Sequence, residues 1–126
     1  MSKEAKTLLL VDDEPDLLES ISIRLKATGY QVETAVDGLE ALKKARSLKP
    51  DLILLDLMLP KMDGYKVARL LKFDGRYSRI PILILSARSQ DLDKEMASSA
   101  GADDYLVKPF SSEELLSRIE KLLQRR

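Results

Sequence analysis

The chain has 126 residues, enough for one domain with a sizeable core and too few for two ordinary ones. Basic and acidic side chains both number 21, so the net charge is zero and no global field favours nucleic acid or an anionic membrane. Cysteine and histidine are absent, which excludes disulfides, thiolate nucleophiles, most zinc sites and imidazole acid–base catalysis.

The amino-terminal segment, MSKEAKTLLLVDDEPD, has only a short apolar run before its acidic residues. It fits neither a signal peptide nor a membrane span. We therefore expect one cytoplasmic domain over residues 1–126, with an ordered core of about residues 5–124 and no membrane contact.

Short apolar runs alternate with segments of helical period, the pattern of βα repeats and a parallel sheet. Strands are predicted, in chain order, near Thr7–Val11, Gln31–Val36, Asp51–Asp56, Pro81–Ser86 and Asp104–Val107. The runs LLLV, LILL and ILIL predict strands that are covered on both faces. The second strand is more mixed and suits an edge.

Apolar residues at helical spacing predict core-facing helices between these strands. The four stripes are Leu18, Ile21 and Leu25; Leu42, Ala45 and Leu48; Val67, Leu70 and Leu71; and Leu115, Ile119, Leu122 and Leu123. Pro15 suits a first helical turn, and Gly29 and Gly101 suit the left-handed residue that ends a helix. Right-handed crossovers then predict a layered α/β sandwich.

A further helix is predicted over Asp91–Ala100. It offers only Leu92, Met96 and small alanines to a core, so little apolar area anchors it. We expect it to be the least stable helix of the domain.

Acidic residues follow two of the predicted strands. Asp12 and Asp13 follow LLLV, and Asp56 follows LILL, so a parallel sheet brings them to one edge, where such sheets bind ligands. Capping of the helix near Pro15 would explain Asp12 or Asp13 alone. Two like charges 4 Å apart, however, repel by about 1 kcal/mol in water and about 4 kcal/mol at an effective dielectric of 20. The cluster therefore predicts a cation site, and its oxygen ligands suit Mg²⁺, with Mn²⁺ as a substitute.

Two other polar side chains are predicted at the same sheet edge. Lys108 follows the run YLV, where it either lies free at a strand end or pairs with Asp56 or a phosphoryl oxygen. Pro109 adds the option of a cis bond that would re-aim Lys108. Ser86 either caps a turn or donates its hydroxyl to a phosphoryl oxygen.

The residues resemble a known family over essentially the whole chain. VDDEPD, DLILLDLMLPKMDG, ILSA and DDYLVKPF occur in the order and at the spacing of the receiver domain of two-component response regulators, which include the chemotaxis regulators. The resemblance implies a doubly wound, five-stranded parallel sheet of order 2-1-3-4-5 with helices on both faces, a flavodoxin-like three-layer sandwich.

The resemblance also implies roles for individual residues. Asp56 becomes the phosphoryl acceptor, and Asp12, Asp13 and the main-chain carbonyl of Met58 hold Mg²⁺ with it. Ser86 and Lys108 contact the phosphoryl group, and Tyr105 is the aromatic residue whose rotation accompanies activation. From composition alone, Tyr105 would be an ordinary half-buried strand tyrosine.

The implied function is a signalling switch without independent substrate turnover. The phosphoryl group must come from a phosphohistidine of a sensor kinase or phosphotransfer protein, since this chain has neither histidine nor a GxxxxGK[ST] loop. Phosphorylation would then change the surface formed by the helix at 91–100, the last strand and the last helix, which controls an unknown downstream protein.

Residues around the implied phosphoryl group and on the output face are also suggested by the resemblance. Met58, Ala87 and Arg88 would flank the phosphoryl group, although Arg88 also fits a solvated loop arginine. A charged set resembles the one that builds dimers in receivers of winged-helix transcription factors: Lys94, Asp103, Asp104, Glu114, Arg118 and Arg125. Glu114 and Arg118 also fit an ordinary i, i+4 pair. Glu95 and Ser98 are polar where those receivers are apolar, so a monomer or a weak phosphorylation-dependent dimer is expected.

Two alternatives remain from the sequence. The chain would also fit the amino-terminal receiver of a DNA-binding transcriptional regulator, in which this domain itself does not bind nucleic acid. A phosphatase with Asp56 as nucleophile is the other alternative. Such enzymes commonly need a second acid two residues on, where this chain has Met58.

Overall fold

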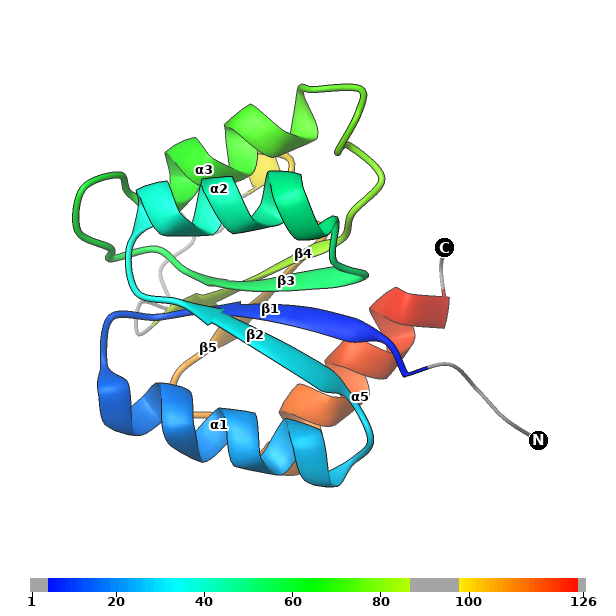
Figure 1. Ribbon diagram of the computed structural model, residues 1–126. Helices are drawn as coiled ribbons and strands as arrows, with labels where there is room; N and C mark the ends of the chain where they lie inside the picture. Colours follow the sequence, from blue (N-terminus) through cyan, green and yellow to red (C-terminus); the bar gives the residue numbers. More distant parts are fainter. Residues whose placement is uncertain (1–4, 87–97, 125–126) are drawn as a thin grey trace.

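A computed structural model describes residues 5–86 and 98–124 of the chain (Figure 1). Its strands are β1 (Thr7–Val11), β2 (Gln31–Ala35), β3 (Leu52–Asp56), β4 (Ile82–Ser86) and β5 (Asp104–Val107). Its helices are α1 (Pro15–Ala27), α2 (Gly38–Leu48), α3 (Gly64–Lys72) and α5 (Ser112–Gln124). Most of the helix predicted over Asp91–Ala100 lies outside the described residues.

All strand pairs are parallel, and the sheet order is β2-β1-β3-β4-β5. This confirms both the parallel sheet and the implied order 2-1-3-4-5. In Figure 1, α2 and α3 cover one face of the sheet and α1 and α5 cover the other. The mixed second strand lies at an edge, as predicted, and β1, β3 and β4 form the interior.

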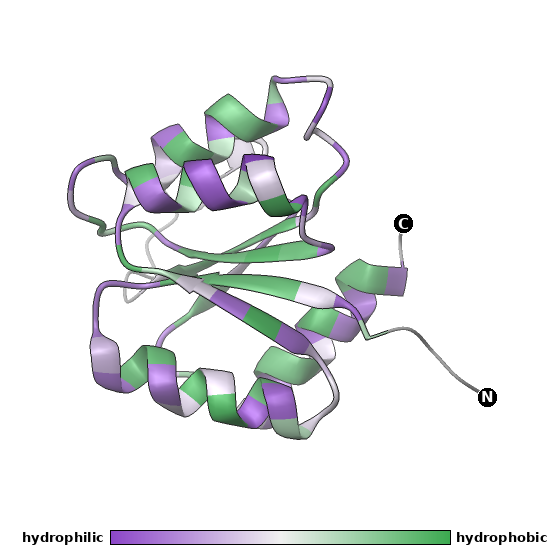
Figure 2. Cartoon of the chain, in the orientation of Figure 1, coloured by the Kyte–Doolittle hydropathy of each residue, from purple (hydrophilic) through white to green (hydrophobic). Residues whose placement is uncertain are grey.

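The two faces of the sheet form two separate apolar cores. Alternate residues of a strand point to opposite faces, so Leu9 and Ile53 pack under α2 and α3, whereas Leu8 and Leu54 pack on α1 and α5. Both β3 and β4 are buried along their whole length, which explains their continuous apolar sequence. Figure 2 shows these apolar strands between helices in which hydrophilic and hydrophobic residues alternate.

Local signals set most element boundaries. Pro15 occupies the first turn of α1, and Gly29 and Gly101 have φ angles of 110° and 90°, as predicted. β2 ends at Ala35, one residue earlier than expected, and the N–H of Val36 donates to the Glu40 carboxylate at 2.8 Å.

Two apolar residues that were predicted in the core are largely exposed. Leu48 is 44% and Leu70 is 39% exposed. Leu48 is the last residue of α2. The buried arc of α3 is formed by Val67, Ala68 and Leu71, and the 100° step per residue places Leu70 beyond the edge of that arc.

Lys72 joins α3 to the edge of the sheet. Its ammonium donates to the carbonyl oxygens of Ser78 and Ile80 at 3.0 and 2.8 Å and lies 2.8 Å from the Asp103 carboxylate. The same carboxylate accepts the N–H of Ile82 at 2.8 Å. One lysine therefore connects the end of α3, the loop before β4 and the residue before β5.

Replacing Lys72 by methionine is expected to lower the free energy of unfolding by about 1–3 kcal/mol. The apolar stem is kept, but two carbonyls and a carboxylate lose their donor in a partly buried place. Urea unfolding monitored by circular dichroism measures the change. Lys66→Met, at an exposed position of the same helix, is the control and is expected to stay within about 0.5 kcal/mol of the parent. Equal losses in both variants would contradict the assigned role of Lys72.

Candidate functional site

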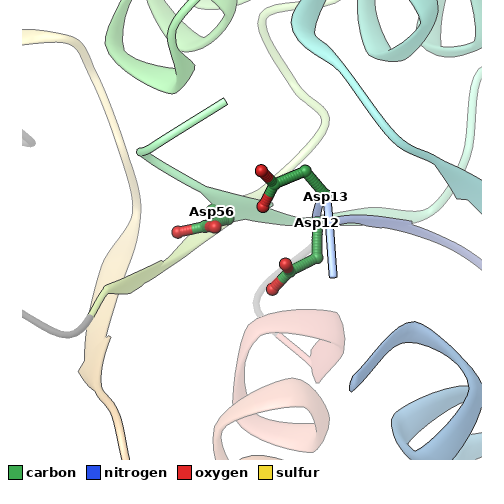
Figure 3. A group of neighbouring side chains, drawn as sticks. All are labelled: Asp12, Asp13 and Asp56. Atoms are coloured by element: carbon green, nitrogen blue, oxygen red, sulfur yellow. The ribbon is translucent and has the colours of Figure 1, made fainter. Parts of the chain in front are cut away.

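Three carboxylates meet where β1 and β3 end. Asp12 and Asp13 directly follow β1, and Asp56 is the last residue of β3, whose neighbour Leu55 is in register with Val11. One carboxylate oxygen from each of the three lies within 4.8 Å of the others. Figure 3 shows these side chains gathered at this edge of the sheet. The predicted convergence is therefore present.

The three acids differ in their exposure to solvent. Asp12 and Asp56 are buried, at 1% and 6% exposure, whereas Asp13 is exposed. Asp12 also accepts the N–H of Glu14 at 3.0 Å, in a turn just before α1; Glu14 is the N-cap of that helix, and no side chain caps it, so the capping alternative is not confirmed. The remaining carboxylate oxygens form a site with a buried floor and an open side.

Lys108 reaches this cluster from the end of β5. Its ammonium lies 2.9 Å from Asp12 Oδ2 and 3.8 Å from Asp56 Oδ2. The sequence suggested Asp56 as its partner, but the shorter contact is with Asp12. The main-chain N–H of Lys108 donates to the Ser86 carbonyl at 2.7 Å, which ties it to the end of β4. The Lys108–Pro109 bond is cis.

Burial raises the pKa of Asp56 to about 6. The Lys108 ammonium opposes this rise and the Asp12 carboxylate adds to it, while the main-chain N–H groups of Met58 and Leu57 stabilise the charged form. Near neutral pH, this carboxylate is therefore an anion that is poorly stabilised by the protein alone. A cation beside it, or neutralisation by covalent modification, would relieve that cost.

The donor set fits a small, hard divalent cation. All available side-chain ligands are carboxylate oxygens, and the described chain offers neither thiolate nor imidazole there. Mg²⁺ is held in proteins by one or two carboxylates together with water and phosphate oxygens, which suits a site that is open on one side. Met58, two residues after Asp56, exposes 63% of its surface. Its main-chain carbonyl oxygen is the ligand that it would offer such a cation.

Ser86 and Tyr105 lie on β4 and β5. Ser86 is the last residue of β4 and is 1% exposed, next to the strand that carries Asp56. Tyr105 lies in β5 and packs, partly buried, against the core under α2 and α3. Ser86 thus lies at the same end of the sheet as the three aspartates, and Tyr105 lies in the neighbouring strand β5.

The predicted charged set of the output face is only partly described. Asp103 pairs with Lys72, and Asp104 pairs with Arg118 at 2.9 Å. Arg118 also donates to the Tyr105 carbonyl at 3.1 Å, so its described contacts are with β5. The backbone N–H of Glu114 donates to Ser111 at the start of α5. Ala87, Arg88, Lys94 and Arg125 lie outside the described residues.

One contact near the site, between the start of α2 and the β3–α3 loop, was not predicted from the sequence. Asp37 caps α2 by accepting the N–H of Glu40 at 2.8 Å, and Lys61 of the loop lies 3.5 Å from the Asp37 carboxylate. Asp37 followed three residues later by Glu40 is a capping-box signal in the sequence that could have located the helix start. In the structure Glu40 accepts the N–H of Val36, one residue before the cap. Its contact with the loop depends on tertiary structure.

Comparison with known proteins decides the family. The family model described as the response regulator receiver domain matches residues 8–120. The chain belongs to the response regulator receiver family. Phosphorylation of an aspartate is characteristic of receivers, which are signalling proteins, and they generally depend on Mg²⁺. The acidic cluster of this receiver is suited to that ion.

The receiver is also similar to individual regulators and solved structures. It is 48% identical over 118 residues to the DNA-binding dual master transcriptional regulator RpaA of Synechocystis, covering 94% of this chain and 49% of that protein. It is 46% identical to the alkaline phosphatase synthesis transcriptional regulatory protein PhoP of Bacillus subtilis, covering 95% of this chain and 49% of that protein. The receiver thus spans about half the length of these relatives.

Among solved structures, the receiver resembles the chemotaxis response regulator CheY4 of Vibrio cholerae, with a TM-score of 0.89, 34% identity, and coverage of 94% of this chain and 99% of that one. A putative response regulator from Chloroflexus aurantiacus gives a TM-score of 0.91 at 36% identity, covering 96% and 99%. These likenesses agree with the strand order and the two helical layers described above.

Proposed function

We propose that this receiver is a phosphorylation-activated switch in which Asp56 accepts a phosphoryl group from the phosphohistidine of a sensor histidine kinase or a histidine phosphotransfer protein. The observation that carries the proposal is the convergence of Asp12, Asp13 and Asp56 within 4.8 Å, with Lys108 at 2.9 Å from Asp12. The proposal treats residues 1–126 as one receiver domain, most of which the family model covers.

Each group of the site has a defined task in phosphoryl transfer. An oxygen of Asp56 attacks phosphorus, the phosphorus–nitrogen bond of the donor breaks, and the bonding electrons stay on the imidazole nitrogen. Asp12, Asp13, the Asp56 carboxylate and the main-chain carbonyl of Met58 would hold Mg²⁺, for which Mn²⁺ could substitute. The bound metal would neutralise charge on the transferring oxygens.

Lys108 and Ser86 are proposed to contact the transferred group. Lys108 lies between Asp12 and Asp56, so a phosphoryl group on Asp56 would compete with Asp12 for its ammonium. Ser86 would donate its hydroxyl to a phosphoryl oxygen. This interaction exists only in the modified state, which is what an equilibrium shift requires. Tyr105 would then reposition, and the surface of β5 and α5 would change.

The internal ion pairs bear on the oligomeric state. Asp103 and Asp104 are both engaged within the protomer, by Lys72 and Arg118. A dimer that used these carboxylates would have to replace those contacts. We therefore propose a monomer, or a dimer that is weak and depends on phosphorylation.

A second candidate places this receiver within a longer DNA-binding regulator. It is supported by relatives whose names describe DNA-binding regulators and of which this chain spans about half. Sequencing the gene beyond codon 126 would test it, since an open reading frame into a second domain is expected. A stop codon there would exclude this candidate.

A cytoplasmic location belongs to the same proposal, because a phosphohistidine donor of a sensor kinase is presented there. Across residues 5–86 and 98–124, none of the helices has the length and apolar character needed to traverse a bilayer. Fractionation of the source cells would test the location. Recovery with the membranes after a high-salt wash would contradict it.

Phosphorylation by a small donor tests the main proposal. Incubation with acetyl phosphate and Mg²⁺ is expected to add one phosphoryl group, seen by intact mass spectrometry, that is released by hydroxylamine as acyl phosphates are. Peptide mapping should locate it at Asp56, and a chelator should prevent its formation. A hydroxylamine-resistant adduct, or one on another residue, would overturn the proposal.

A further inference from the structure

Two Asp-Gly pairs enclose the loop that links Asp56 to α3. Asp37 and Gly38 start α2, and Asp63 and Gly64 start α3. In each pair the aspartate caps its helix: Asp37 accepts the N–H of Glu40 at 2.8 Å, and Asp63 accepts the N–H of Lys66 at 3.0 Å. The loop between them, residues 57–63, carries Met58.

Gly38 and Gly64 lie where the neighbouring backbone leaves no room for a side chain. Neither has a positive φ; in the described chain, glycines at positions 29 and 101 have that property. A Cβ on Gly38 would lie 2.6 Å from the carbonyl carbon of Met62 and closer still to its oxygen. A Cβ on Gly64 would lie 2.9 Å from Leu57 Cα and press on the carbonyl of Asp56. Backbone, which cannot swing aside like a side chain, blocks both positions.

Hydrogen bonds hold the loop in this narrow space. The N–H of Gly38 donates to the Pro60 carbonyl at 3.2 Å, and the N–H of Gly64 donates to the Leu57 carbonyl at 3.0 Å. Lys61, whose φ is 69°, adds its contact with Asp37. The start of α2 therefore supports the loop from one side, and the start of α3 supports it from the other.

The loop acts directly on the acceptor carboxylate. Main-chain N–H groups of Leu57 and Met58 donate to the Asp56 carboxylate, so a shift of the loop changes the position of that carboxylate. To reach ordinary contact distance from a Cβ on Gly38, the carbonyl oxygen of Met62 must move by roughly 1.5 Å. Functional groups tolerate displacements of only about 0.5 Å, and Mg²⁺ demands near-ideal octahedral geometry.

We infer that Gly38 is a positioning residue for the divalent-metal site, although it does not itself line the acidic cluster. Because Gly38 has no side chain, α2 contacts the β3–α3 loop closely enough to keep Met58 and Asp56 in the positions that the metal site requires. This inference rests on the proposed function, since it takes the acidic cluster to be a Mg²⁺ site. It concerns the geometry of this chain's own residues, which can be measured without phosphorylation.

The test compares Gly38→Ala with Gly75→Ala by titration calorimetry with Mg²⁺. A Cβ on Gly75 meets no atom within 4 Å, so this control introduces the same methyl group into open space. We expect Gly38→Ala to weaken Mg²⁺ binding by about 10- to 100-fold, the range for residues that orient metal ligands. Gly75→Ala should leave the affinity unchanged.

Urea unfolding of the metal-free proteins separates positioning from stability. If Gly38→Ala lowers the free energy of unfolding but binds Mg²⁺ with the parent's affinity, the residue is merely structural and the inference is overturned. If the parent protein itself fails to bind Mg²⁺, it is the proposed function that fails.

A second variant decides the question if Gly38→Ala does not fold. Lys61→Met removes the loop's contact with Asp37 at a side chain that is 62% exposed. Loss of a cation would by itself strengthen Mg²⁺ binding. The inference instead predicts weaker binding, because the loop loses its attachment to α2. In that case, unchanged or tighter binding by Lys61→Met overturns it.

Discussion

Replacing Asp56 by asparagine is expected to abolish phosphoryl acceptance from acetyl phosphate. The amide of asparagine has no anionic oxygen with which to attack phosphorus, and the two carboxylates that remain nearby, Asp12 and Asp13, are the ones proposed to hold the metal. Intact mass spectrometry after incubation with the donor and Mg²⁺ measures the result. Glu19→Gln, which neutralises an exposed carboxylate on α1, is the matched control and should be phosphorylated as the parent is.

The same variant is expected to be more stable than the parent at neutral pH. The folded pKa of Asp56, about 6, lies above its unfolded value of about 3.9, so the stability associated with this group is present below about pH 4 and is lost as the pH rises through 6. Asparagine has no charge to bury and can still accept the N–H of Met58. In metal-free buffer its advantage should therefore grow between pH 4 and pH 7.5 to at most about 2–3 kcal/mol.

Urea unfolding of both proteins across that pH range, with a chelator present, measures the difference. Because solvent reaches this end of the sheet and screens the charge of Asp56, the value of about 2–3 kcal/mol is an upper bound on the difference in the free energy of unfolding. A constant difference between the two proteins at all pH values would show that Asp56 does not carry a raised pKa. Continued labelling of Asp56→Asn by the phosphoryl donor would separately reject the acceptor assignment.

Replacing Lys108 by methionine is expected to change metal binding and phosphoryl transfer in opposite directions. Without the ammonium, Asp12 and Asp56 lose their cation, and the more negative site should bind Mg²⁺ at least about tenfold more tightly. The transferring oxygens, in contrast, lose a charged donor, which should slow phosphoryl acceptance by about 10²–10³-fold. The methionine side chain keeps most of the apolar stem.

Calorimetric titration with Mg²⁺ and the rate of phosphorylation at saturating Mg²⁺ give the two quantities. Lys121→Met, on the exposed face of α5, is the control for loss of one positive charge and should alter neither. If Lys108→Met weakens both metal binding and phosphorylation, the lysine organises the site as a structural element. Its proposed contact with the phosphoryl group would then have to be abandoned.

The contact between Lys108 and Asp12 balances a buried charge in the unmodified protein. Asp12 is 1% exposed and would be a costly buried charge without the ammonium at 2.9 Å. In the unmodified protein the Lys108 ammonium is therefore paired with Asp12. The Asp56 carboxylate is its second and more distant partner, at 3.8 Å. Phosphorylation would change the balance between two contacts that already exist.

The sequence by itself determined the class of fold and the chemical character of the site. Continuous runs of leucine and isoleucine predict strands buried on both faces, and the polar residues that end them, such as Asp12, Asp56 and Ser86, must then meet at one edge of a parallel sheet. These conclusions follow from periodicity and chain order. The order of the strands required resemblance to a family, because helical crossovers of similar length allow several orders.

Only the tertiary structure decided which groups touch. It placed Lys108 closer to Asp12 than to Asp56, engaged Asp103 with Lys72, and brought Gly38 against the backbone of Met62. These contacts join segments far apart in the chain, so their distances depend on how loops and helix ends pack against one another. Periodicity reports which face of an element is apolar, but it contains no information on that packing.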